Sequence, residues 1–460
     1  MNTKQPMLFT YTNRQFNRTL CISYSQFITK KGETIMEQKL ARSVSIIGTS
    51  TLPQRYFDDP MYEGLSIYEL WACACHQAME DAGVKPRDID KIVYSQMANY
   101  VTAGNVLAMV GTLEEWIGLA GKPIIHIEQA CASGYIAFME ACNAVASGKC
   151  DIVLVAGIET PKHFNSRNQP AHMIRPIAEY EEWWSPGRAL FDTTYYRFDG
   201  VSDNLLTDEQ ARLYMKNYGV SEETIDDTYN AMAVNLRRNA SRNPRAAERR
   251  EFAEIAKENG FDDVMEYMRS EEHNRKITRF IRKRGSVLHN VAAGAIVVCS
   301  SDIAKKFSQK PIEVIDFASS SNTQRFPYCF HQMNVDVRDA LYKDDIDPNE
   351  LDLMITTVMT SGEQLDSAEV FGYLPEGKGY QYELDGRTCF DGDKPINPHG
   401  GDLSFGHAFG ASGINMLSEA ILQMRGEAGD CQVQKDVRKC LVRGMGGGHT
   451  TVGIILETKE

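Results

Sequence analysis

The succession of apolar runs and amphipathic stretches constrains this chain most, because it occurs twice. In the first half, short apolar runs predict strands over 43–49, 91–95, 123–127 and 151–157, and helical spacing predicts helices over 66–83, near 104–118 and over 132–147. In the second half, the same criteria predict strands over 311–317, 352–359, 438–443 and 450–457, and helices over 335–343, 366–373 and 411–426. Two similar halves predict a duplicated α/β fold with pseudo-twofold symmetry, in which the helices that follow 131 and 410 pack antiparallel at the centre.

A long segment separates the two halves. We expect residues 42–160 and 286–310 to form the first half, 161–285 an inserted loop domain, and 311–460 the second half. Residues 1–41 are expected to be a disordered tail, since 1–35 carry five basic residues and one acid without periodicity. Lys31–Met36 could be encoded by a purine-rich ribosome-binding sequence, so Met36 is a candidate start; a mitochondrial presequence is the alternative.

Composition excludes several classes of protein. No apolar run reaches the roughly 18 to 20 residues that span a bilayer, and no secretory signal is evident, so a cytoplasmic protein without membrane contact is expected. A net charge of -13 argues against nucleic-acid binding. The 11 cysteines include no CxxC pair, so neither a metal site nor a disulfide framework is expected.

One cysteine stands where a thiol can become a nucleophile. Cys131, in the stretch QACASG, follows the apolar run 123–127 and precedes an amphipathic helix. The unpaired N–H groups and positive dipole of a helix N-terminus favour thiolate over thiol. A buried structural cysteine is the alternative.

Two glycine-rich segments lie downstream. Residues 397–413 (NPHGGDLSFGHAFGASG) hold five glycines and two histidines, which is typical of a backbone that approaches a ligand closely. Residues 444–449 (GMGGGH) lie between two predicted strands and are expected to form a glycine loop.

Together with the cysteine segment and in this order, these motifs resemble the thiolase superfamily, especially its sterol-carrier type. The resemblance covers about 42–457 and implies a five-layered α-β-α-β-α fold, a homodimer, and coenzyme A as co-substrate without a permanently bound cofactor. It implies that Cys131 forms an acyl-thioester, that His407 is its base and an oxyanion donor, and that the N–H groups of Cys131 and Gly446 complete the oxyanion hole. A structural histidine is the alternative for His407.

The sequence departs from the family at the second acid/base cysteine. Its position in the last glycine segment is Gly444, and the family's alternative His-Asp-Cys-Phe motif is replaced by Thr357-Val-Met-Thr360. A thiolysis still requires a group that accepts and returns protons. The candidates are His407 acting twice, His449, His399, Glu363, a substrate carboxylate or a bound water.

Basic and aromatic clusters in the insertion are candidate binding surfaces. Candidates for the phosphates of coenzyme A are Arg237, Arg238, Arg282 and Lys283, with Ser412 from the glycine-rich run; a solvated charged face is the alternative. Trp183, Trp184, Arg188, Tyr195 and Arg197 could line an acyl pocket with an arginine for a carboxylate, or could be packing anchors of an irregular loop.

In lacking both acid/base cysteines, this sequence is similar to the atypical thiolase subunits that act with a small OB-fold, zinc-ribbon partner. Among these, the aromatic insertion is most similar to that of thiolase subunits acting on 2-benzoylsuccinyl-CoA. This implies thiolysis to benzoyl-CoA and succinyl-CoA. Another condensing or C-acyltransferase enzyme of the same fold, or a non-catalytic scaffold subunit, remains the alternative.

Overall fold

The computed structural model describes residues 41–56, 59–97, 109–159, 203–287, 290–307, 310–321, 328–344, 346–447 and 450–458. The expected N-terminal tail up to residue 40 and the aromatic part of the insertion lie outside these residues. No helix in the described ranges combines the length and apolar character needed to cross a bilayer.

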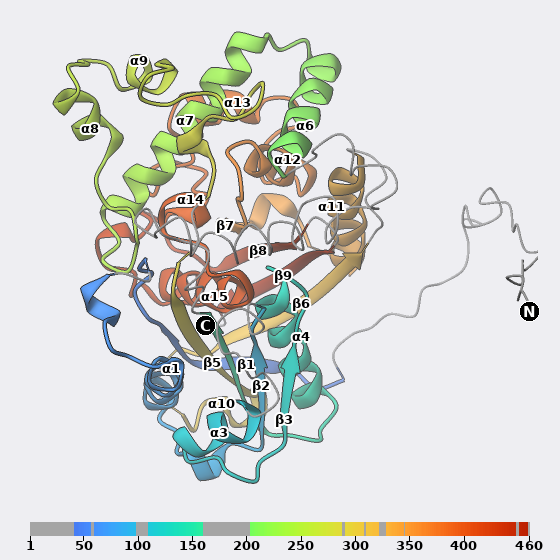
Figure 1. Cartoon of the computed structure of the whole chain (residues 1–460). Helices are drawn as coiled ribbons and strands as arrows, with labels where there is room; N and C mark the ends of the chain where they lie inside the picture. The colour runs from blue at the N-terminus through green and yellow to red at the C-terminus, as the bar shows by residue number, and fades with distance from the viewer. Residues whose placement is uncertain are drawn as a thin grey trace, which may run out of the picture. The chain divides into compact units, whose positions relative to one another are not determined.

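The described strands form one mixed sheet (Figure 1). They are β1 (Val44–Thr51), β2 (Lys91–Ser95), β3 (Ile124–Ile127), β4 (Ile152–Glu159), β5 (Ala292–Ser300), β6 (Ile312–Ser321), β7 (Leu353–Thr356), β8 (Lys439–Gly446) and β9 (Thr450–Thr458). Their order is β3-β2-β4-β5-β1-β6-β9-β8-β7. The pairs β2–β3, β2–β4 and β7–β8 are parallel, and the remaining pairs are antiparallel.

The sheet repeats one topology. In the first half the order is β3-β2-β4-β5-β1. In the second half β7-β8-β9-β6 corresponds to β2-β4-β5-β1, and Ile396, which forms a parallel bridge with Met354 of β7, lies where β3 lies in the first half. A short antiparallel pairing of β1 with β6, from Val44 opposite Val314 to Ile46 opposite Ile312, joins the halves. The duplicated α/β fold predicted from the sequence is therefore confirmed.

The described helices are α1 (Ile67–Ala82), α3 (Met109–Trp116), α4 (Ser133–Ala146), α6 (Asp203–Tyr218), α7 (Glu222–Ser241), α8 (Phe252–Glu258), α9 (Val264–Arg269), α10 (Ser301–Ala304), α11 (Tyr328–Leu341), α12 (Glu363–Val370), α13 (Gly379–Leu384), α14 (Gly401–Ser404) and α15 (Phe409–Arg425). Local signals explain boundaries such as those of α1, which starts with a Ser66–Glu69 capping box and ends at Gly83 in the left-handed conformation. Helix α11 starts seven residues before the predicted 335–343.

Helices α4 and α15 occupy the centre of the fold, where they share one core with strands of both halves (Figure 1). A Cβ at Gly134 would lie 2.7 Å from the backbone N of Ile414, and one at Gly413 would lie 2.5 Å from the N of Tyr135. Only glycine permits this approach of two backbones. The predicted contact between the two helices is confirmed.

Helices α6 to α9 lie in the sequence between β4 and β5, within the predicted insertion. Helix α7 packs against α13 and α14 of the second half (Figure 1). The insertion thereby contacts the glycine-rich run, since α14 lies within it.

Candidate functional site

Cys131 lies in the turn between β3 and α4. Helix α4 starts at Ser133 with Ala132 as its N-cap, so Cys131 precedes the helix by one residue more than predicted. The turn is fixed by hydrogen bonds from Ala132 N to Gln129 O (3.1 Å) and from Gln129 N to Ser133 Oγ (2.7 Å). The cysteine side chain is buried, at 5% exposure.

The structure brings His407 from the other half to this cysteine. Its Nε2 lies 3.1 Å from the Sγ of Cys131, although the two are 276 residues apart. Asn290 fixes the histidine backbone: its Oδ1 accepts from His407 N (3.1 Å), and its N donates to His407 O (2.9 Å). The imidazole is fully buried, so its neighbours, and not water, determine its charge and tautomer.

The other ring nitrogen of His407 meets Asp402, which sequence reasoning missed. Asp402 Oδ1 lies 2.7 Å from His407 Nδ1, and its Oδ2 accepts from Val358 N (2.8 Å). Ser412, predicted to bind coenzyme A, places its Oγ 3.2 Å from the same Nδ1 and accepts from Ala408 N (2.8 Å). The sequence did contain a signal for Asp402, which is the only acidic residue in the glycine-rich run 397–413.

These contacts determine the charge of the imidazole. Burial is the largest single influence on the pKa of His407 and lowers it, but the charge of Cys131 and the hydrogen bonds to Asp402 and Cys131 together raise it to about 10. An imidazolium at neutral pH stabilises a thiolate beside it. The buried sulfur therefore has the electrostatic partner that a nucleophile needs.

Backbone strain surrounds the pair. Among the described residues other than glycine, positive φ angles occur at Ala130 (49°), Asn397 (49°) and Phe409 (39°). Ala130 and Phe409 pack with Cys131, Met97 and Met359. Such strain persists only where the surroundings enforce it and is concentrated at functional sites.

The last strands also reach the cysteine turn. A Cβ at Gly446 would lie 2.5 Å from Gln129 O and 2.7 Å from Ala132 N, so this backbone lies against the turn that carries Cys131. The prediction of a glycine loop from residue 444 was wrong in its start, because β8 continues to Gly446, which pairs with Thr450. A strand that packs this closely on a turn cannot carry side chains on that face.

Tyr135 fills the space beside Gly444. A Cβ there would lie 2.3 Å from the Cδ2 of Tyr135, whose hydroxyl lies 3.1 Å from Thr357 Oγ1. The position of the family's second cysteine therefore has no room for a side chain.

The other predicted proton carriers differ in their surroundings. Glu363 accepts from Met359 N (2.9 Å) and therefore stands close to the walls of the cysteine site. His399 places Nε2 2.8 Å from the sulfur of Met416, and burial together with the charge of Arg245 lowers its pKa to about 3. It is therefore a neutral core residue. His449 lies outside the described residues.

Three of the four basic residues predicted to bind coenzyme A are engaged within the protein. The closest ion pairs are Arg237–Glu248 (3.2 Å), Arg238–Asp391 (2.6 Å), Arg282–Asp226 (3.0 Å) and Arg282–Glu271 (2.8 Å). Lys283 is exposed. These contacts favour the structural interpretation for the three arginines. The candidates for the acyl pocket, Trp183, Trp184, Arg188, Tyr195 and Arg197, lie outside the described residues.

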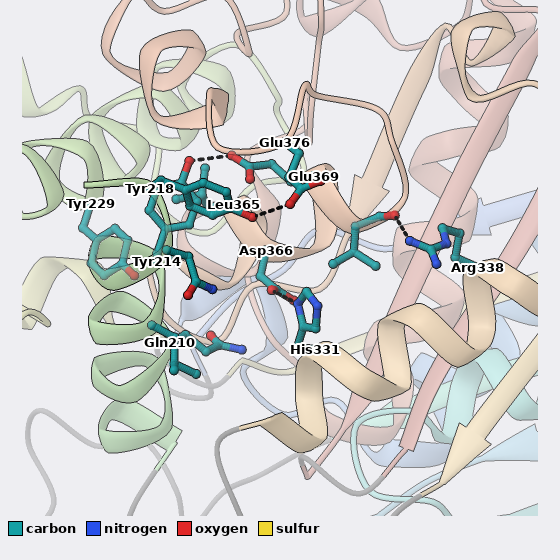
Figure 2. Close-up of a pocket in the computed structure, with 14 residues that line it drawn as sticks. Gln210, Tyr214, Tyr218, Tyr229, His331, Arg338, Leu365, Asp366, Glu369 and Glu376 are labelled. Atoms are coloured by element: carbon teal, nitrogen blue, oxygen red, sulfur yellow. Dashed lines mark hydrogen bonds and ion pairs between the residues drawn. The ribbon is translucent and has the colours of Figure 1, made fainter. Parts of the chain in front are cut away.

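A separate pocket lies between α6, α11 and α12 (Figure 2). Its hydroxyl and carboxylate groups pair with each other, Tyr214 with Glu369 (2.6 Å) and Tyr218 with Glu376 (2.8 Å). Neither Cys131 nor His407 lines it. Two basic side chains, His331 and Arg338, also line the pocket, and His331 Nδ1 pairs with Asp366 (2.8 Å).

Comparison with known proteins agrees with the geometry. Residues 44–281 match the model of the thiolase N-terminal domain, and residues 318–458 match that of the thiolase C-terminal domain-like family. An acetyl-CoA acetyltransferase of Methanothermobacter thermautotrophicus is 28% identical, covering 78% of this chain and 85% of its own. The benzoylsuccinyl-CoA thiolase subunit BbsB of Thauera aromatica is 26% identical, covering 79% and 87%.

Solved structures show the same fold. The structure entitled "Ltp2-ChsH2(DUF35) aldolase" superposes with a TM-score of 0.68 at 20% identity, covering 91% of this chain and 98% of that one. Human mitochondrial 3-ketoacyl-CoA thiolase superposes with a TM-score of 0.62 at 14% identity, covering 92% and 100%.

Proposed function

Because this chain belongs to the thiolase family, we propose that Cys131 is the nucleophile of a thiolase-type acyl-CoA C-acyltransferase. The observation that carries the proposal is the 3.1 Å approach of His407 Nε2 to Cys131 Sγ. A thiolate held beside an imidazolium can attack the 3-oxo carbon of an acyl-CoA, and a covalent acyl-thioester divides one difficult C–C cleavage into two easier steps. Coenzyme A then takes the acyl group.

The oxyanion that forms during acyl transfer needs preorganised donors. The N–H groups of Cys131 and Gly446 are the proposed donors, with His407 as a third, because the two backbones lie against each other where the thioester would form. Removing one such donor typically reduces kcat by about 10²- to 10³-fold. No permanently bound cofactor enters this chemistry.

For the substrate, we propose 2-benzoylsuccinyl-CoA, cleaved to benzoyl-CoA and succinyl-CoA. The similarity to subunit BbsB supports this substrate, whereas the similarity to an acetyltransferase supports acetoacetyl-CoA as its competitor. A homodimer and a small OB-fold, zinc-ribbon partner belong to the same proposal. A relative named as a subunit, and a structural neighbour whose title joins two components, support the partner.

Mass spectrometry of the intact protein tests the function. Incubation with 2-benzoylsuccinyl-CoA should give a benzoyl adduct on Cys131 and acetoacetyl-CoA an acetyl adduct, and the rates distinguish the substrates. Cys131→Ser should lose the adduct, whereas Cys73→Ser, which changes an exposed thiol, should retain it. Absence of any adduct from a full panel of 3-oxoacyl-CoAs, with and without partner, would instead support a scaffold subunit.

A kinetic test addresses the base. His407→Ala should reduce kcat by at least about 10²-fold, the usual contribution of a positioned acid/base, while the protein remains folded. Unchanged turnover would remove His407 from the mechanism.

A further inference from the structure

We propose that Asp402 enables His407 to carry both protons of the reaction, so that one imidazole replaces the absent second cysteine. Asp402 is in this view a positioning residue that acts through His407. The inference rests on the proposed function and adds to it a Cys131–His407–Asp402 triad.

Among the described residues, the other candidate positions for a proton carrier near Cys131 either lack a side chain or are held by other contacts, while His449 lies outside the described residues. Gly444 cannot gain a side chain without displacing the ring of Tyr135, which would lie 2.3 Å from its Cβ. His399 faces a methionine sulfur. Glu363 is engaged by Met359 N at 2.9 Å and lies 3.4 Å from Thr360 Oγ1.

The imidazole of His407 has a fixed orientation. Both oxygens of Asp402 are committed, one to His407 Nδ1 (2.7 Å) and the other to Val358 N (2.8 Å). An ionised carboxylate only accepts hydrogen bonds, so Nδ1 must carry a proton. Nε2 is therefore the position at which a proton comes and goes, and it faces the sulfur of Cys131.

The negative charge of Asp402 stabilises the protonated ring of His407. Asp402 and His407 are both buried, at 1% and 0% exposure, and interactions between charges are strong in such surroundings. When Cys131 is acylated, it no longer contributes a negative charge to the imidazolium. Asp402 then remains to stabilise the protonated ring, which allows His407 to hold a proton in both half-reactions.

The proton balance closes with this single group. The Cys131 thiol gives its proton to His407 Nε2, and the thiolate attacks the 3-oxo carbon of the substrate. Collapse of the adduct breaks the C2–C3 bond, leaves the acyl group on Cys131, and releases a carbanion that takes the proton from Nε2. Neutral His407 then accepts the thiol proton of coenzyme A, whose thiolate attacks the thioester and releases Cys131 as thiolate beside an imidazolium.

Asp402→Asn tests the triad, because the amide is nearly isosteric. The asparagine oxygen can still accept from Val358 N, while its NH₂ donates to Nδ1 and forces the proton onto Nε2. We expect kcat to fall by at least about 10²-fold, as expected for a wrong tautomer of a catalytic histidine. Asp391→Asn, which breaks the Arg238 ion pair, is the matched control for loss of one carboxylate.

Two readouts separate positioning from simple structural support. In Asp402→Asn, the pH at which iodoacetamide alkylates Cys131 at half its maximal rate should rise by about one unit or more. Exchange of the α-protons of acetyl-CoA in D₂O should fall at least tenfold, with the variant still folded by circular dichroism. Wild-type values for both readouts, or loss of exchange in Glu363→Gln but not in Asp402→Asn, would overturn the proposal.

The proposed function can fail separately. If the wild-type protein forms no acyl adduct, the function itself is wrong. If it forms the adduct and Asp402→Asn behaves as wild type in alkylation and exchange, only the triad is wrong.

Discussion

A side chain introduced at Gly444 should destabilise the protein measurably. In Gly444→Ala, the new Cβ would lie 2.3, 2.5 and 2.7 Å from three ring carbons of Tyr135, whereas carbon atoms prefer separations of roughly 3.5–4.0 Å. The ring must therefore move by about 1 Å. Tyr135 is fully buried within the central core, so the movement displaces its neighbours as well.

The magnitude follows from two contributions. Overpacking of a dense core typically costs about 1–3 kcal/mol. Displacing the tyrosine also weakens its hydroxyl contact with Thr357 (3.1 Å), and a hydrogen bond contributes about 1 kcal/mol. We expect the free energy of unfolding to fall by about 2–4 kcal/mol.

Urea denaturation of four proteins measures this effect: wild type, Gly444→Ala, Tyr135→Leu and the double variant. The double variant should recover part of the loss caused by Gly444→Ala when each is compared with its parent, because leucine leaves more room. Gly444→Ala within about 0.5 kcal/mol of wild type, the range of a neutral surface change, would refute the steric reasoning. Gly444→Cys should likewise be destabilised, and its turnover should not exceed that of wild type.

Two further predictions concern residues outside the Cys131–His407 pair. The depressed pKa of His399, about 3, means that the unfolded state binds this proton more readily; its contribution to stability is present above about pH 6.5 and is lost as the pH falls towards 3. His399→Leu should therefore lose less free energy of unfolding than wild type between pH 7 and 4, and equal losses in the two proteins would contradict this. Arg238→Ala should leave the KM for coenzyme A within about twofold, because its guanidinium pairs with Asp391, and a large rise in KM would restore the coenzyme A interpretation.

Much of the fold could be predicted because local pattern and tertiary environment agree. The capping box at Ser66 and the amphipathic spacing after Cys131 specify their helices locally. Strand β5 was not predicted, because its sequence AAGAIVVCS is rich in small residues and lacks alternation. It lies between β1 and β4 and is buried along its whole length, so partners distant in the sequence create its strand.

The residues of the candidate site also fall into those that local sequence predicts and those that depend on tertiary contacts. The positions of Cys131 and His407 could be predicted from motifs, because each depends on its own turn. The contact of Asp402 with His407 depends on how α14 and α15 are oriented. Arg238 pairs with Asp391 and Arg282 with Asp226, and these acids are distant from the arginines in the sequence. A charged cluster in a sequence does not reveal which of its members are already neutralised.

The division of the site between two halves has one consequence for activity. The sulfur of Cys131 and the imidazole of His407 come from opposite halves, and they precede the two helices, α4 and α15, that approach each other closely at Gly134 and Gly413. Under the proposed mechanism, the first half alone carries the nucleophile without its proton acceptor, and the second half alone carries the acceptor without the nucleophile. Under the proposed mechanism, catalysis therefore requires both halves of the fold, because neither half contains both groups.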